Sequence, residues 1–236
     1  MTTDSTTTDH PATRSALRVR HAPETVRAAV LTAHGGRAED HTLSRPWHLA
    51  AMRMRPLLRA VGAGLPADHV LLGEIRYRHR GWNDGAAADD VRRALAELAA
   101  RHGSVPVVLV GHSMGGRAAL RVADHPAVRG VLALAPWLPP GEPTAHLDGA
   151  RLLVLHGDAD HVTSAADSSR FVQRARAEGA RAGMVVLADT DHAMLRRLPT
   201  WHTLAAEAVA DLLRTRPVPG GLLARTTLSD APAVHL

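Results

Sequence analysis

Several residue types are absent or scarce in this chain, and each absence excludes a class of site. None of the 236 residues is cysteine, which excludes disulfides, thiolate metal sites and a cysteine nucleophile. Aromatic residues make up only 3%, too few for a surface that stacks on nucleic-acid bases. No apolar run approaches the roughly 20 residues that cross a bilayer, and residues 1–10 lack the basic start and apolar segment of a secretory signal. We therefore expect a cytoplasmic protein with no membrane partner.

Lysine is also absent, so all 28 basic side chains are arginine, and the formal net charge is +5. These arginines are scattered along the chain rather than clustered, which argues against nucleic acid as a partner. Neither H-E-x-x-H nor any paired Cys/His spacing occurs, so no metal or other cofactor is expected. The composition, 45% hydrophobic and 22% charged, is that of a globular protein with one sizeable core.

Composition divides the chain into three regions. Residues 1–15 are rich in Thr, Ser and Asp without periodicity, which predicts a disordered leader. Residues 16–215 carry the periodic segments and form the predicted domain. Residues 216–236 are interrupted by Pro and Gly, which predicts a C-terminal tail.

Within the predicted domain, short apolar runs alternate with longer amphipathic ones. Strands are predicted at 17–21, 26–33, 69–78, 105–110, 128–135, 152–156 and 184–188. Helices are predicted at 46–61, 84–102, 114–124, 165–178 and 199–214. This alternation predicts an α/β fold: a doubly wound, mostly parallel sheet of about seven or eight strands. In such sheets, ligands bind beyond the carboxyl ends of the strands.

One predicted strand runs directly into the sequence Gly111-His-Ser-Met-Gly115, which matches G-x-S-x-G. A serine held on a strand-to-helix turn needs strained backbone angles, and its neighbours two residues away must be nearly free of side chains. Ser113 is therefore a candidate nucleophile, with the backbone N–H of Met114 facing a developing oxyanion. The plain alternative is a tight turn in which Ser113 only caps the next helix.

The same stretch invites a second interpretation, a phosphate-binding loop. Gly111 and Gly116 have the glycine spacing of G-x-x-x-x-G-K-[ST]. That loop needs a lysine and a hydroxyl next, where this chain has Arg117 and Ala118. A nucleotide-binding function is therefore disfavoured.

Chemistry-bearing residues also follow three other predicted strands. They are His34-Gly35-Gly36, then Asp158 and Asp160 in the sequence H-G-D-A-D, and finally Asp191-His192. With Ser113, the chain order is glycine loop, serine, acid, histidine. This order resembles the α/β-hydrolase superfamily over about residues 17–214, and most of all compact bacterial esterases of the dienelactone-hydrolase-like type. The chain departs from the dienelactone hydrolases themselves at one point: they use a cysteine nucleophile, and this chain offers only Ser113.

The resemblance implies a role for each residue. The family pattern H-G-x-x-D selects Asp160 as the acid that orients His192, with Asp158 as the alternative. The backbone N–H of Gly36 becomes the second oxyanion donor, beside that of Met114. The family usually has glycine before the histidine, where this chain has Asp191, whose carboxylate either approaches the imidazole or points to water.

Substrate-binding residues are less specified. Trp137, Trp82 and His112 are candidate pocket residues, and the alternative for the two tryptophans is surface packing. Arg78, His79 and Arg80 offer charge for a carboxylate-bearing substrate, unless they form a solvated loop. The 136–151 connection is too short for a lid domain, so we expect an open site.

The sequence thus predicts a single-domain serine hydrolase that cleaves small carboxylic esters through an acyl-enzyme at Ser113. Its partner is a small-molecule ester or related acyl substrate. Acyl transfer, thioester cleavage and amide hydrolysis use the same triad and stay open, as does a non-catalytic binding module. The oligomeric state is left open.

Overall fold

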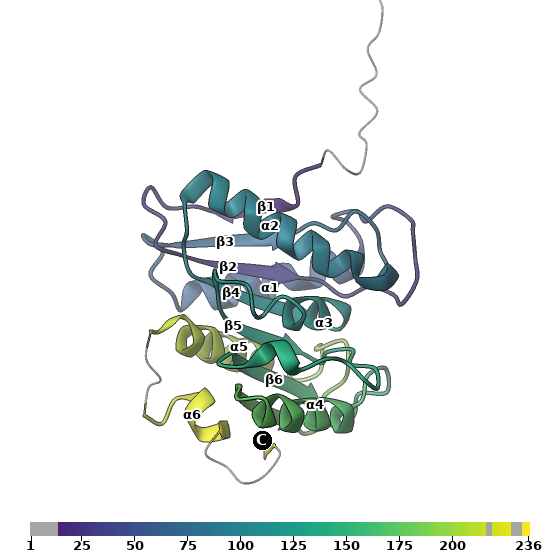
Figure 1. Cartoon of the computed structure of the whole chain (residues 1–236). Helices are drawn as coiled ribbons and strands as arrows, with labels where there is room; N and C mark the ends of the chain where they lie inside the picture. The colour runs from purple at the N-terminus through teal and green to yellow at the C-terminus, as the bar shows by residue number, and fades with distance from the viewer. Residues whose placement is uncertain (1–13, 216–218, 228–232) are drawn as a thin grey trace, which may run out of the picture.

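The computed structural model describes residues 14–215, 219–227 and 233–236, and within these ranges eight strands form one sheet with helices on both faces (Figure 1). The strands are β1 (Leu17–His21), β2 (Ala28–Ala33), β3 (Val70–Ile75), β4 (Val107–His112), β5 (Val128–Leu134), β6 (Arg151–Gly157), β7 (Arg181–Leu187) and β8 (Val234–His235). The helices are α1 (Leu49–Ala63), α2 (Ala86–His102), α3 (Met114–Leu120), α4 (Ala165–Ala177), α5 (Leu198–Leu213) and α6 (Leu222–Thr227). Residues 1–13 of the expected leader lie outside the described residues.

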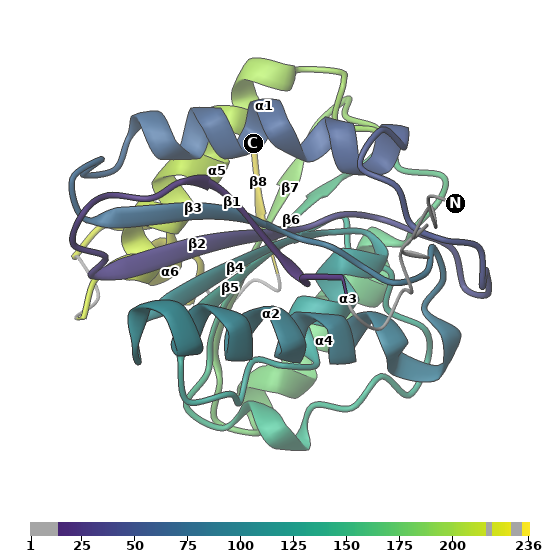
Figure 2. The same ribbon diagram turned by 90° about the horizontal axis from the view of Figure 1, so that it is seen from above.

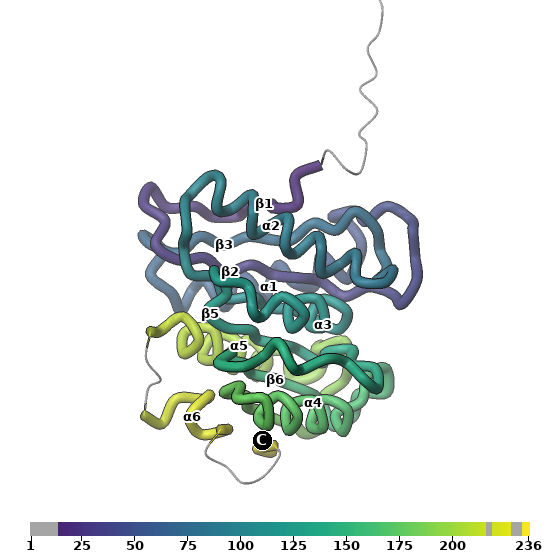
Figure 3. The backbone as a smooth tube through the Cα atoms, viewed as in Figure 1, coloured from purple at the N-terminus to yellow at the C-terminus, as the bar shows by residue number. Residues whose placement is uncertain are grey.

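The strand order is β1-β3-β2-β4-β5-β6-β7-β8, with β1 antiparallel to β3 and every other neighbouring pair parallel. The predicted doubly wound sheet is confirmed. From β2 the chain moves outward to β3 and then returns to the opposite side of β2 as β4. Figure 3 shows the path of the backbone from β1, in purple, to the C-terminal end, in yellow. This reversal opens a crevice beyond the carboxyl ends of β2 and β4, where doubly wound sheets bind ligands.

Two helical layers cover the sheet. Viewed from above, α1 and α5 lie on one face and α2, α3 and α4 on the other (Figure 2). All six residues of β4 are buried between the layers, which explains the unbroken apolar run at residues 107–110. Helix α2 buries Val91, Leu95 and Leu98 at the spacing that its sequence predicts.

The C-terminal segment differs from the expected tail. Leu222 and Leu223 of α6 are buried in the cluster that α5 also joins, and Val234 of β8 pairs with Val185 of β7. Burial of these apolar side chains and pairing of the β7 edge hold parts of the segment on the domain. The Pro- and Gly-rich sequence obscures both short elements, while residues 216–218 and 228–232 lie outside the described ranges.

Element boundaries differ by a few residues from the sequence prediction. Helix α1 begins at Leu49, because the preceding residues form a turn in which the His48 N–H donates to the Arg45 carbonyl. The helix continues through Pro56. Strand β4 extends to His112, so the serine follows the sheet directly. The connection from β5 to β6 holds only a 3-10 turn at Ala145–Leu147 and no lid. None of the helices in the described ranges is long and apolar enough to cross a membrane.

Candidate active site

Ser113 occupies a strained turn between β4 and α3. Its φ of 54° and ψ of −119° lie where L-residues are rarely found. A Cβ on Gly111 would lie 2.2 Å from the Gly115 carbonyl oxygen, and a Cβ on Gly115 would lie 2.2 Å from that of Ala33. Both glycines are therefore sterically required, as the sequence predicts. The turn places Ser113 on the wall of a cavity whose lining and volume are described below.

The glycine loop after β2 lies against this turn. Strand register pairs Ala33 with Gly111, so the residues that follow the two strands meet. A Cβ on Gly35 would lie 3.3 Å from the Ser113 Cβ, and one on Gly36 would lie 2.5 Å from the Met114 sulfur. The Gly36 N–H has no acceptor among the described residues. Met114 is the first residue of α3, and the N–H groups of the first helical turn have no hydrogen-bond partner within the helix.

His192 and Asp160 meet across the ends of β6 and β7. The register pairs Gly157 with Leu187, and the two loops that follow bring Asp160 Oδ2 to 2.8 Å from His192 Nδ1. The Asp160 side chain is fully buried, whereas that of His192 is 16% exposed. One side of the imidazole is thus held by a carboxylate and the rest of the ring reaches the cavity.

Asp160 is surrounded by donors. Its Oδ1 accepts the backbone N–H groups of Val162 and Thr163 at 2.8 and 2.9 Å, and Oδ2 lies 3.3 Å from His156 Nε2. Burial by itself would raise the pKa of Asp160, but hydrogen bonds from His156, His192 and these N–H groups hold it below the usual value. Asp160 is therefore ionised and able to stabilise a positive charge on His192.

The other two carboxylates near the histidine have different environments. Asp158 is exposed, and no hydrogen bond of its side chain is found in the described part of the chain. The Asp191 carboxylate accepts the Leu195 N–H at 3.3 Å, so it caps the local turn. Of the two acids that the sequence offers, Asp160 is the one in contact with His192.

Ser113 and His192 line one cavity of about 580 Å³. No hydrogen bond joins their side chains in the described ranges, so proton transfer requires a small ring or rotamer shift, as is common in unliganded sites. Trp47, Leu49 and Val162, which also line the cavity, are 64%, 77% and 70% exposed. The cavity therefore opens directly to solvent through an apolar rim.

The two tryptophans predicted as pocket walls lie elsewhere. The Arg117 guanidinium lies 4.0 Å from the Trp82 ring centre and 4.6 Å from that of Trp137. Arg117 Nε also donates to Glu142 at 2.7 Å. Trp82 is buried in this cluster, and Trp137 borders a separate hollow beside Asp160. Neither ring is among the residues that line the cavity with Ser113, because Arg117 of α3 packs on the faces of both, so their contact with substrate stays a prediction.

His112 lines the cavity, but its contact differs from the substrate contact expected. The ring is 2% exposed, and Nε2 lies 2.9 Å from the His192 carbonyl oxygen. Burial lowers the pKa of His112 to about 3, helped by the adjacent His192. The neutral ring therefore donates its Nε2 proton to that carbonyl and ties the β4 turn to the histidine loop.

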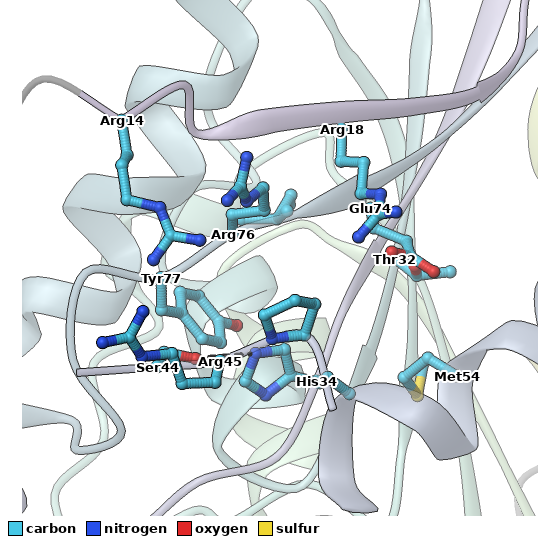
Figure 4. Close-up of a pocket in the computed structure, with 13 residues that line it drawn as sticks. Arg14, Arg18, Thr32, His34, Ser44, Arg45, Met54, Glu74, Arg76 and Tyr77 are labelled. Atoms are coloured by element: carbon cyan, nitrogen blue, oxygen red, sulfur yellow. Dashed lines mark hydrogen bonds between the residues drawn. The ribbon is translucent and has the colours of Figure 1, made fainter. Parts of the chain in front are cut away.

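His34, which follows β2, packs beside Tyr77, which follows the end of the neighbouring strand β3. Its ring centre lies 4.6 Å from that of Tyr77 (Figure 4), and its Nε2 is 3.4 Å from Ser44 Oγ. The pocket around these side chains has a volume of about 30 Å³, room for about one water molecule. His34 Nδ1 also lies 2.7 Å from the Gly35 carbonyl oxygen, so the ring supports the glycine loop. A pocket of this volume is too small for an ester substrate.

Sequence reasoning missed the contribution of α1. One wall of the cavity is formed by Trp47 and His48, which precede α1, and by Leu49, Ala50 and Arg53 of its first two turns. Nothing in their sequence pattern separates them from an ordinary amphipathic helix. His156 was visible within H-G-D-A-D, but its contact with the acid depends on the loop geometry. Within the described ranges, no group of three or more His, Asp or Glu side chains is arranged to hold a metal ion.

The chain is similar to a known protein family and to several solved structures. The profile of the alpha/beta hydrolase domain family matches residues 84–212. The comparison with curated proteins finds no match. TT1662 from Thermus thermophilus superposes with a TM-score of 0.60 at 20% identity, covering 85% of this chain and 99% of its own.

Two further solved structures have the same fold. XC6422 from Xanthomonas campestris, described as an α/β serine hydrolase without a lid, gives a TM-score of 0.59 at 17% identity, covering 85% and 89% of the two chains. A thermophilic esterase, Est2 from Thermogutta terrifontis, gives 0.63 at 16% identity, covering 84% and 88%. The finer resemblance to dienelactone-hydrolase-like esterases stays a prediction. The family match spans more than half of the chain and agrees with the fold: this protein belongs to the α/β-hydrolase domain family.

Proposed function

We propose that this protein is a serine hydrolase that cleaves small carboxylic esters. The observation that carries the proposal is the contact between buried Asp160 and His192 at the wall of the cavity that Ser113 also lines. Esterases among the structural neighbours support the ester as the bond cleaved. The open cavity, without an inserted domain, gives water access to an acyl-enzyme.

In this mechanism His192 removes the proton of Ser113 as Oγ attacks the ester carbonyl carbon. Asp160 keeps the His192 proton on Nδ1 and stabilises the imidazolium that forms. The N–H groups of Gly36 and Met114 hold the negative carbonyl oxygen. His192 then protonates the leaving alcohol, and water, activated by the same histidine, releases the acid and restores Ser113.

Labelling with a fluorophosphonate, followed by mapping of the adduct, tests the nucleophile. The wild-type protein should be labelled at Ser113, and Ser113→Ala should abolish both labelling and ester hydrolysis. Persistent labelling of a folded Ser113→Ala variant would exclude this serine. A folded wild-type protein that is neither labelled nor active would support the binding-module alternative.

Acyl transfer, thioester cleavage and amide hydrolysis would use the same triad of Ser113, His192 and Asp160. Rates with different classes of substrate distinguish these reactions. Matched ester, thioester and amide substrates with one acyl group should show a burst of the first product and the highest kcat/KM for the ester. A higher kcat/KM for the thioester or amide would reassign the leaving group. Product that appears only when a second acyl acceptor is added would indicate a transferase.

A further inference from the structure

The cavity beside Ser113 has an unbalanced charge. Its lining contains Arg37, Arg53 and Arg80, but none of the lining residues is Asp or Glu. The acid that pairs with two of these arginines is Asp40, which is not part of the lining. The charge facing the substrate space is therefore positive.

One carboxylate serves both loop arginines. Asp40 Oδ2 lies 3.8 Å from Arg37 Nε and 3.6 Å from Arg80 Nη1, distances longer than a direct charged hydrogen bond. The Arg37 and Arg80 side chains remain 68% and 38% exposed. Because one carboxylate serves two guanidinium groups, each guanidinium keeps N–H donors that can bind a ligand.

Arg53 has no such partner. It lies half-buried on α1, and in the described ranges its side chain makes neither a hydrogen bond nor an ion pair. Its positive charge contributes to lowering the pKa of His112, the residue next to Ser113. Arg53 is therefore an uncompensated charge close to the reacting centre.

The backbone adds to this field. Leu49 and Ala50, at the start of α1, line the same cavity, and the first turn of the helix contains no acidic residue. The positive end of the 15-residue helix dipole thus faces the same space as the three arginines. Arginine is the side chain best suited to bind carboxylate or phosphate through paired donors.

We propose that the esters cleaved at Ser113 carry an anionic group, a carboxylate or a phosphate, that Arg53 binds together with Arg37 and Arg80. This inference rests on the proposed hydrolase function and specifies its substrate class. The exposed apolar rim of Trp47, Leu49 and Val162 accommodates an apolar remainder of the substrate.

Matched neutral and anionic esters test the proposal. With the charge on the acyl side, para-nitrophenyl hemisuccinate is compared with para-nitrophenyl butyrate after subtraction of the spontaneous rates. With the charge on the alcohol side, para-acetoxybenzoate is compared with its methyl ester, and para-acetoxyphenyl phosphate supplies the phosphate. We expect kcat/KM to favour an anionic ester by about tenfold or more in at least one comparison, and this preference to shrink as salt is added.

Variants assign the preference to the cavity. Arg53→Gln should lower the ratio of anionic to neutral kcat/KM by about tenfold, and Arg37→Gln combined with Arg80→Gln should lower it as well. Arg59→Gln is the matched control, because Arg59 is an exposed arginine of the same helix outside the cavity lining. It should keep the wild-type ratio and salt dependence.

The outcomes separate this inference from the proposed function. If neutral esters are hydrolysed and Ser113 is labelled, but no anionic ester is preferred, the inference fails and the hydrolase function stands. A preference that survives in both the Arg53→Gln and the double variant also overturns it. If no ester is hydrolysed and Ser113 is not labelled, both proposals fail together.

Discussion

His156 Nε2 lies 3.3 Å from Asp160 Oδ2, the same oxygen that His192 Nδ1 approaches at 2.8 Å. Both the His156 and the Asp160 side chains are fully buried. His156 Nδ1 is 2.9 Å from Ser168 Oγ, so one consistent assignment has Ser168 donating to Nδ1 and Nε2–H donating to the carboxylate. The acid opposite His192 is thus held by a second histidine, which makes His156 a candidate positioning residue.

His156→Asn should move the acid limb of the kcat/KM profile to higher pH. With one donor fewer, the Asp160 carboxylate is more basic and stabilises the His192 imidazolium better. A hydrogen bond of about 1 kcal/mol corresponds to a shift of about 0.5–1 pH unit. Ser168→Ala, which removes only the outer partner, should shift the limb less. If His156→Asn lowers the stability but leaves the acid limb of the kcat/KM profile at the wild-type pH, His156 has only a structural role.

Asp160→Asn should lower kcat by about 10³ to 10⁴-fold, the loss typical of a triad whose acid can no longer fix the histidine tautomer. Asp158→Asn is the internal control, since its exposed carboxylate lies in the same loop without contacting His192. Steady-state kinetics on one neutral ester, with thermal unfolding to verify folding, measure both. A larger loss in Asp158→Asn would reverse the assignment.

Gly115→Ala should destabilise the fold by about 1–3 kcal/mol or more and abolish ester hydrolysis. The added Cβ would lie 2.2 Å from the backbone oxygen of Ala33, so α3 and the serine must move. Urea unfolding measures the loss. Gly64→Ala, whose Cβ would meet no atom closer than 3.7 Å, should leave the urea midpoint nearly unchanged.

Acid should destabilise the protein through His112. Its pKa is lowered to about 3 in the folded state, against about 6.5 when unfolded. Between these values the unfolded chain binds the proton and the folded one does not, so stability is full above about pH 6.5 and falls as the pH drops toward 3. The contribution is about 1.4 kcal/mol per pH unit within that window.

Urea unfolding at several pH values, compared between wild type and His112→Asn, isolates this contribution. The variant should lose less stability than the wild type between pH 6.5 and 4, even if it is less stable at pH 8. Parallel curves for the two proteins would assign the acid sensitivity in this window to other groups, for instance to His34, whose pKa burial also lowers. The stabilisation from ionised Asp160, whose pKa is lowered, is lost only below about pH 4.

Much of the fold was predictable from local pattern. The continuously apolar strand that becomes β4 can be stable only between two covering layers, and the i, i+4, i+7 leucines and valine of α2 fit only one buried face. The sequence also predicted which loops form the site, because the carboxyl ends of parallel strands lie at one edge of the sheet. Short elements such as α6 and β8 escaped, since their few residues carry no periodic signal and depend on packing against β7.

The strained turn at Ser113 follows from the local sequence, because the Gly111 backbone lies too close to the Gly115 carbonyl, and the Gly115 backbone too close to the Ala33 carbonyl, for either to carry a side chain. The sequence also selected the segments that follow β2, β4, β6 and β7 as the site. Three contacts depend on how distant elements pack: Asp160 rather than Asp158 contacts His192, Arg117 packs on the faces of Trp82 and Trp137, and Arg53 lines the cavity. Local backbone strain depends on residues that are neighbours in the sequence. The partners of a side chain depend on the register and crossing of elements that are far apart in the sequence, so a short stretch of sequence does not predict them.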